Sequence, residues 1–155
     1  MKKLFDILHS ARKWYWRTFN VKTFGVRVIV KKDDEFLLVK HRYGDFWVFP
    51  GGGVNKNEDV RDAGVREVLE ETGIHIGEFE RTLGEYNNTA EGKNDTVTVL
   101  IAREWKTLIQ SKWSLEIKEK GFFDVGELPK NTSPATVRRI NEYLSGGIRE
   151  FSGKW

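Results

Sequence analysis

The segment from residue 51 to residue 73 constrains the fold most strongly, because glycines lie at both ends of a helix-like run. Gly51–Gly53 lets the backbone turn and approach a ligand closely. Over residues 59–72, apolar side chains recur at three- and four-residue steps, which predicts a helix with one buried stripe. The residues of that stripe are Val65, Val68, Leu69 and Thr72. Gly73 follows where a helix end needs a left-handed residue, so we expect the helix to stop there.

The other side of this predicted helix carries Glu67, Glu70 and Glu71 at positions i, i+3 and i+4. Carboxylates this close repel one another and raise one another's pKa unless a positive charge lies among them. Arg66 offsets part of that charge, and a hard divalent cation such as Mg²⁺ or Mn²⁺ would neutralise it through oxygen ligands. Glu58 joins the group only if it lies in a loop just before the helix. A solvated acidic helix face is the alternative that the three glutamates alone leave open.

The whole segment resembles the Nudix box, with every fixed position of that box filled. The positions that carry the resemblance are Gly52, Glu58, Arg66, Glu67, Val68, Glu70, Glu71, Gly73 and Ile74. The box covers residues 52–74, and a looser similarity extends over most of residues 24–145. The resemblance implies the α+β class, with a Nudix-type α/β/α sandwich around a mixed central sheet.

Nudix proteins hydrolyse nucleoside diphosphates linked to another group X with Mg²⁺ or Mn²⁺, so the resemblance implies a metal-dependent pyrophosphohydrolase. Carried over by position, the metal ligands would be Glu67, Glu70 and Glu71. Glu58 would support the metal shell, and Arg66 would orient the glutamates through charge-assisted hydrogen bonds. Metal ions of this kind stabilise the charge on phosphate oxygens and acidify the attacking water.

The general base and the substrate contacts are predicted less directly. Glu67 is the first choice as general base, and Glu116, in a later loop, is the alternative. The candidate substrate-binding residues are Gly51, Gly52, Gly53, Arg27, Arg42 and Trp47. The glycines would let the loop pass close to phosphates, the arginines would contact phosphates, and the tryptophan would stack on a base. Surface solvation for the arginines and core packing for the tryptophan are the alternatives.

Outside this segment the pattern predicts strands, a second helix and a short tail. Residues 24–30 and 36–41 are expected to form a hairpin, and a helix with Ser133 as N-cap and Pro134 at its first position is expected to run to about Leu144. Further strands are expected at 46–49, 79–86, 96–104 and 121–124. The expected domains are an amphipathic helix within 1–20, a Nudix domain over 21–147 and a mobile tail over 148–155.

Composition excludes several classes of protein. The chain contains no cysteine, which excludes disulfide scaffolds, zinc–cysteine sites and thiol nucleophiles. No run approaches 18 apolar residues, so we expect no transmembrane helix. Without a recognisable secretion signal, the expected location is the cytoplasm. His9, His41 and His75 show no metal-ligand spacing and are interpreted as surface or edge residues.

The first 27 residues contain seven lysines and arginines against one aspartate, although the whole chain has a net charge of only +3. Helical periodicity over residues 3–19 combines these charges with aromatic residues. Such a helix can make peripheral contact with an anionic membrane. We favour packing on the sheet or against a second subunit in a homodimer, and a solvated basic helix is also open.

Three functions remain open at this point. The first is a Mg²⁺-dependent pyrophosphohydrolase acting on a small nucleotide such as ADP-ribose, a nucleoside triphosphate or a dinucleoside polyphosphate. The second is a pyrophosphohydrolase acting on RNA 5′ ends, with the basic helix contacting RNA. The third is a non-catalytic module that senses a nucleotide, which would be expected to lack box glutamates that this chain retains.

Overall fold

Two four-stranded sheets form the centre of the computed structural model, which describes residues 22–88, 94–108, 115–146 and 151–155. The first sheet has the order β1 (Lys22–Ile29), β6 (Asn94–Thr107), β5 (Ile74–Asn88) and β8 (Phe151–Lys154). In the second sheet, β3 (Glu35–His41) pairs with β2 (Lys31–Lys32), β4 (Trp47–Val48) and β7 (Ile117–Asp124). The helices in the described part of the chain are α2 (Val60–Thr72) and α3 (Pro134–Leu144), and η2 (Val125–Glu127) is a short 3-10 helix.

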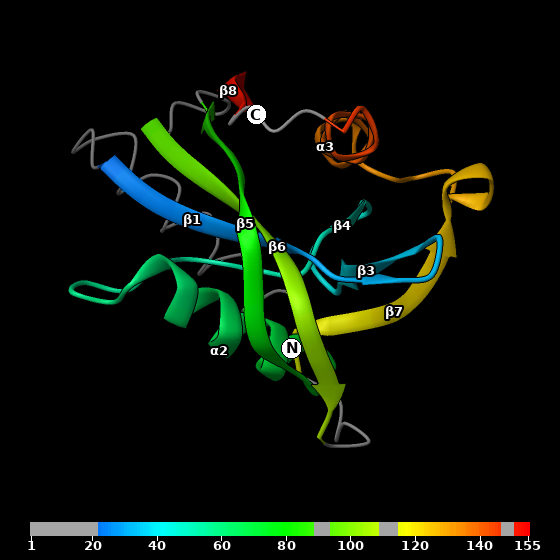
Figure 1. Ribbon diagram of the computed structural model, residues 1–155, viewed down its shortest axis with the longest axis horizontal. Helices are drawn as coiled ribbons and strands as arrows, with labels where there is room; N and C mark the ends of the chain where they lie inside the picture. The colour runs from blue at the N-terminus through cyan, green and yellow to red at the C-terminus, as the bar shows by residue number, and fades with distance from the viewer. Residues whose placement is uncertain (1–21, 89–93, 109–114, 147–150) are drawn as a thin grey trace.

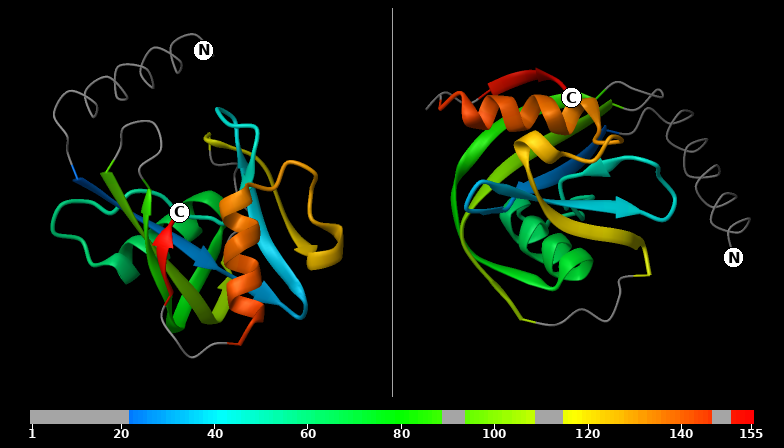
Figure 2. Two further views of the ribbon diagram at one scale, coloured as in Figure 1. Left: turned by 90° about the horizontal axis from the view of Figure 1, so that it is seen from above. Right: turned by 90° about the vertical axis from the view of Figure 1, so that its right-hand side faces the viewer.

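The first sheet is mixed, because β1 and β6 run parallel, β5 and β6 run antiparallel, and β8 runs parallel to β5. In Figure 1, α2 lies below the strands and α3 above them, while Figure 2 shows how β5 and β6 curve along one side of the molecule. The predicted α+β class is therefore confirmed. The predicted N-terminal helix lies outside the described residues, within which no helix is long and apolar enough to cross a membrane.

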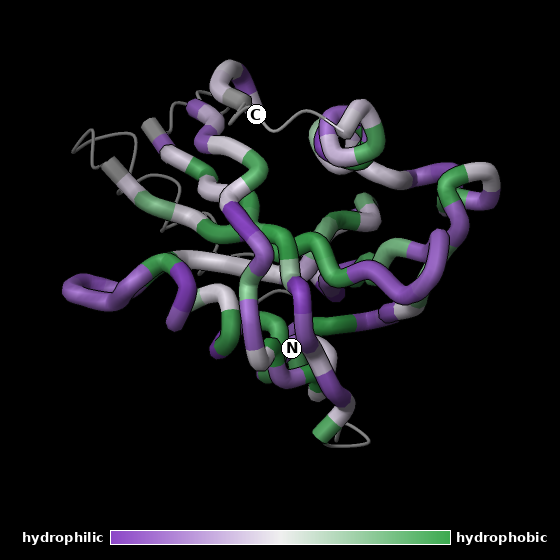
Figure 3. Tube along the Cα trace, in the orientation of Figure 1, coloured by the Kyte–Doolittle hydropathy of each residue, from purple (hydrophilic) through white to green (hydrophobic). Residues whose placement is uncertain are grey.

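Alternation along the strands explains why the helices cover opposite faces, since successive side chains of a strand point to opposite sides. Leu100 of β6 packs in the cluster that contains Val68 of α2. Its neighbour Val99 packs in the cluster that contains Ile140 of α3. All four residues are buried. Figure 3 shows hydrophobic residues concentrated where the central strands cross, whereas the loop before α2 is hydrophilic.

Both ends of α2 are capped by side chains or by glycine. Asp59 accepts a hydrogen bond from the Arg61 N–H at 2.7 Å, which satisfies a donor at the N-terminus of the helix. Gly73 adopts a left-handed φ of 76° and donates its N–H to Leu69 O at 2.9 Å. Lys120 of β7 donates to Thr72 O at 2.7 Å, which satisfies a carbonyl in the last turn. The helix predicted over residues 59–72 is thus confirmed, except that Asp59 is its N-cap and the helix begins at Val60.

The predicted hairpin is wrong in its pairing. β1 pairs with β6 rather than with β3, and only Lys31–Lys32 turns back to pair with β3, opposite Glu35 and Phe36. The other edge of β1 is taken by the glycine loop, because the N–H groups of Val26 and Val28 donate to carbonyls of residues 52 and 50, both at 2.9 Å. The loop therefore lies along β1 in the place that a hairpin partner would need.

The C-terminal segment also differs from expectation. Ser133 caps α3 by accepting from the Thr136 N–H, as predicted. Residues 151–154, expected to belong to a mobile tail, instead form β8 beside β5. Arg138 donates to Trp155 O at 2.7 Å. The guanidinium of Arg139, in the same helix, stacks over the Tyr86 ring at 3.8 Å. Contacts from α3 and a ladder from β5 therefore hold the segment in place.

Candidate active site

The three glycines of the loop have three different environments. Gly51 has a φ of +140°, and a Cβ atom there would lie 2.1 Å from Val26 O. A Cβ atom on Gly52 would lie 2.6 Å from the carboxylate of Glu67. One on Gly53 would meet nothing within 4 Å. Residue 51 must therefore be glycine because of its backbone conformation and the nearby Val26 O. At residue 52, a side chain would collide with the carboxylate of Glu67.

Arg27 of β1 anchors this loop from the sheet side. Its Nη1 donates to Phe49 O at 3.1 Å and to Gly51 O at 2.6 Å. From the other side, Glu71 Oε2 accepts the N–H of Gly51 at 2.9 Å, so α2 holds the loop as well. The guanidinium of Arg27, predicted to contact phosphate, binds carbonyls of the protein in this structure. It also acts electrostatically on the buried carboxylate of Glu71.

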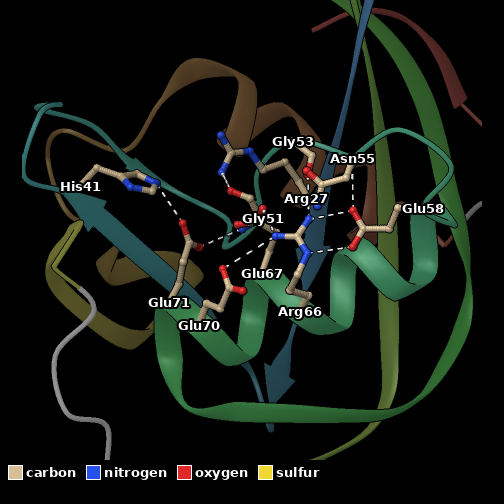
Figure 4. Close-up of polar contacts among 10 residues, drawn as sticks. All are labelled: Arg27, His41, Gly51, Gly53, Asn55, Glu58, Arg66, Glu67, Glu70 and Glu71. Atoms are coloured by element: carbon tan, nitrogen blue, oxygen red, sulfur yellow. Dashed lines mark hydrogen bonds and ion pairs between the residues drawn. The ribbon is translucent and has the colours of Figure 1, made fainter. Parts of the chain in front are cut away.

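Arg66 is the centre of the acidic group (Figure 4). Its Nε donates to Glu58 Oε1 at 2.8 Å and its Nη2 to Glu58 Oε2 at 2.9 Å, a two-pronged contact. Its Nη1 donates to Glu67 Oε1 at 2.7 Å, and its Nη2 also donates to Gly53 O at 3.0 Å. The more exposed Glu70 lies 3.7 Å from the same Nη1. Glu58 lies in the loop before α2, as membership of the group requires.

Glu71 lies at the buried end of the group, although the helical pattern predicted that it shares one side of the helix, opposite the buried stripe, with Glu67 and Glu70. It is only 6 % exposed. His41, at the end of β3, is 8 % exposed, and its Nε2 lies 3.4 Å from Glu71 Oε1. The interpretation of His41 as a surface or edge residue is therefore wrong. Its place directly after the buried run of β3 is the sequence feature that would have indicated burial.

Burial is the main electrostatic influence on two of the glutamates. It raises the pKa of Glu71 to about 7, with smaller upward contributions from Glu67 and Glu116 and opposition from Arg27. Burial also raises the pKa of Glu67, against the lowering effect of the hydrogen bond from Arg66. Both carboxylates are costly to ionise as they stand. A cation beside them would reverse that penalty.

The pKa values of Glu58 and His41 are lowered instead. Hydrogen bonds from Arg66, and then from the Asn55 backbone, lower the pKa of Glu58 to about 2. Burial, together with the charge of Arg27, lowers the pKa of His41 to about 4. At neutral pH, Glu58 is therefore a carboxylate and His41 a neutral imidazole.

The donor chemistry of the group fits a hard divalent cation, since such ions prefer carboxylate oxygens. Within the described residues, however, no three histidine or acidic side chains are placed to hold a metal ion as they stand. Glu67 pairs with Arg66, and Glu71 accepts from Gly51. The donors are thus gathered on one side of α2 but are engaged with the protein itself.

The remaining predicted residues fall in different places. The backbone O of Glu116 accepts the N–H of Arg42, the residue after His41, at 2.8 Å, and both side chains are exposed. Trp47 is 9 % exposed and packs edge-on against Phe123 in the core. Its predicted role in stacking on a base is therefore wrong, because strand alternation turns Trp47 inward and leaves Phe46 exposed.

Comparison with known proteins agrees with this geometry. The model of the NUDIX domain matches residues 21–143. Over 91 residues the chain is 39 % identical to a bovine (Bos taurus) diphosphoinositol polyphosphate phosphohydrolase 3-beta, which covers 55 % of each protein. Over 75 residues it is 41 % identical to a human (Homo sapiens) diphosphoinositol polyphosphate phosphohydrolase 2, covering 48 % of this chain and 41 % of that protein. The chain thus spans about half the length of the curated relatives it matches.

Solved structures share the fold. A MutT NUDIX hydrolase from Burkholderia pseudomallei superposes with a TM-score of 0.70 at 24 % identity, over 79 % of this chain and 98 % of that one. An ADP-ribose pyrophosphatase from Streptococcus suis superposes with a TM-score of 0.60 at 20 % identity, over 86 % and 98 %. The family match covers most of the chain and includes the glycine loop, Arg66 and the glutamates of α2. The chain belongs to the NUDIX family.

Proposed function

We propose that this chain hydrolyses the pyrophosphate linkage of a nucleoside diphosphate linked to another group X, with Mg²⁺ or Mn²⁺ as cofactor. The observation that carries the proposal is the group of glutamates around Arg66, held against a glycine loop in which Gly51 and Gly52 leave no room for a side chain. Pyrophosphate hydrolysis needs charge neutralisation beside a backbone that approaches phosphates closely. The relatives, named phosphohydrolases and a pyrophosphatase, support the same class of reaction.

The metal ligands in this proposal are Glu67, Glu70 and Glu71, with Glu58 supporting them. When bound, the cation would neutralise phosphate charge and acidify the attacking water. Arg66 would keep Glu58 and Glu67 oriented, since its guanidinium contacts both. The N–H of Gly51 would keep Glu71 oriented in the same way.

Glu67 is our candidate general base, with Glu116 as the alternative. The carboxylate of Glu67 lies against the backbone of Gly52, in the loop that would approach the phosphates, which is where a general base is needed. The charge of Glu116 contributes to the raised pKa of Glu71, so Glu116 acts electrostatically on this group of glutamates.

A hydrolysis screen tests the proposal. The panel contains ADP-ribose, nucleoside triphosphates, dinucleoside polyphosphates, a nucleotide sugar, 5′-triphosphorylated RNA and a diphosphoinositol polyphosphate, each with Mg²⁺ or Mn²⁺. Products are identified by chromatography. We expect cleavage of a small nucleotide that is abolished by a chelator and by Glu71→Gln but retained in Asp62→Asn, an exposed control on the same helix. If the screen yields no cleavage at all, the proposal is wrong.

A further inference from the structure

Tyr43 lies just beyond β3 and stacks on His41. The two ring centroids are 4.9 Å apart, with an interplanar angle of 26°. His41 in turn lies 3.4 Å from Glu71. A single imidazole ring therefore separates Tyr43 from one of the proposed metal ligands.

Exposure of an aromatic side chain is not by itself a sign of function. Phe24 is 58 % exposed and Phe46 is 55 % exposed, much like Tyr43 at 51 %. What sets Tyr43 apart is its stack on a buried residue that touches the glutamate group. One face of its ring rests on His41, and half of the side chain remains open to solvent.

We propose that Tyr43 is a specificity-determining residue whose exposed ring stacks on the base of a nucleotide held by its diphosphate at the glutamates. This inference rests on the proposed function and narrows it to substrates with a planar aromatic group. An aromatic ring offers stacking to any base, because every base has a π-face. A phosphorylated inositol ring has no such face and is recognised through cations instead.

The test compares substrates and ligands with and without a base. For the wild-type protein, Tyr43→Leu, Tyr43→Phe and Phe46→Leu, KM and kcat are measured with ADP-ribose. Dissociation constants are measured by calorimetry for α,β-methylene-ADP, which resists hydrolysis, and for methylenediphosphonate, which has no base. Mg²⁺ is present throughout, and circular dichroism verifies that each variant is folded. Phe46→Leu is the matched control, because it removes an equally exposed aromatic ring from the same loop.

We expect Tyr43→Leu to raise KM for ADP-ribose and the dissociation constant of methylene-ADP by about tenfold or more. The kcat and the affinity for methylenediphosphonate should stay within about twofold, and Tyr43→Phe and Phe46→Leu should resemble the wild type. Unchanged values in Tyr43→Leu would overturn the inference. An equal loss of both ligands would also overturn it, since that outcome indicates a structural role through His41.

The outcomes also separate this inference from the proposed function. If the wild type hydrolyses nucleotides but Tyr43→Leu has an unchanged KM, the function stands and the inference fails. If the wild type hydrolyses none, yet Tyr43→Leu selectively weakens the binding of methylene-ADP, the inference stands and the function fails. A wild type that binds methylenediphosphonate as tightly as methylene-ADP contradicts the inference directly.

Discussion

The carboxylate of Glu67 rests directly against the backbone of Gly52, because a Cβ atom at residue 52 would lie 2.6 Å from both Cδ and Oε2 of Glu67. The glycine loop and α2 are therefore in contact through Gly52 and the carboxylate of Glu67. A substitution at Gly52 would therefore displace the Glu67 carboxylate while leaving the backbone of the loop in place.

Gly52→Ala should impair activity far more than stability. The added methyl group meets the flexible end of Glu67, which can move aside, so the free energy of unfolding should change by less than about 1 kcal/mol. The displaced carboxylate should lower kcat/KM by roughly tenfold to a hundredfold. Steady-state kinetics and urea unfolding measure the two effects.

The neighbouring glycines are the controls for this prediction. Gly53→Ala should retain activity and stability, because its Cβ atom meets nothing within 4 Å. Gly51→Ala should lose more than about 2 kcal/mol of stability, since its φ of +140° and the contact with Val26 O leave no room for a side chain. Equal losses of stability in all three variants would contradict the assignment.

Glu71→Gln should lower turnover by at least about a hundredfold, because electrostatic stabilisation of the developing charge commonly contributes that much. The substitution keeps the shape of the side chain and its ability to accept from Gly51. Turnover is measured at saturating Mg²⁺ and nucleotide. A variant within about threefold of the wild type would mean that Glu71 is not a metal ligand.

The same variant should reveal a pH-dependent cost of Glu71. Its pKa is raised from 4.5 to about 7, so the folded protein retains a proton that the unfolded chain loses between these values. The contribution of this group to the free energy of unfolding is therefore fully present below pH 4.5. As the pH rises through 7, the protein loses about 3 kcal/mol of that free energy. Glutamine does not ionise and escapes that loss.

Without metal, Glu71→Gln should therefore gain stability relative to the wild type on going from pH 5 to pH 8. Guanidinium unfolding in a chelating buffer at both values measures the change. The lowered pKa of His41 acts in the opposite direction, with stability lost as the pH falls from 6.5 towards 4. His41 is present in both proteins, and because it contacts Glu71 the comparison reports the loss of the Glu71 carboxylate together with its effect on His41. A stability difference that does not change with pH would contradict the raised pKa.

Arg66→Lys should reduce kcat by about tenfold to a hundredfold, as is typical when the residue that orients a metal ligand is lost. A lysine ammonium cannot contact both oxygens of Glu58 together with Glu67 and Gly53 O in the way that the planar guanidinium does. Arg61→Lys, an exposed change on the same helix, is the control. Kinetics in which both variants match the wild type would exclude an orienting role for Arg66.

Local signals were sufficient to predict α2 from the sequence. Gly73 marks its C-terminal end through a short-range hydrogen bond, and the required loop position of Glu58 follows from helical geometry alone. Asp59, expected as the first helical residue, is instead the N-cap. The partner of β1 was not predictable in this way, because strand propensity does not specify which segment pairs with it. That partner is β6, about seventy residues along the chain, with the glycine loop on the other edge.

The burial of Glu71 and His41 was missed for a related reason. The pattern of α2 shows which residues share a side, but the covering of that side comes from β3 and from the glycine loop. For Trp47, alternation allowed either of two phases, and only the tertiary packing against Phe123 decides between them. The periodicity of a single segment carries no information about such contacts with residues far away in the sequence.

The candidate site draws on two sheets that share no strand. Arg27 comes from β1 of the first sheet, His41 from β3 of the second, and α2 supplies the glutamates. A ligand bound there would contact residues of both sheets and would link the two sheets to each other. Because a ligand stabilises every element whose opening would release it, saturation should slow amide-hydrogen exchange in β6 as well as in β3, far beyond the residues it touches.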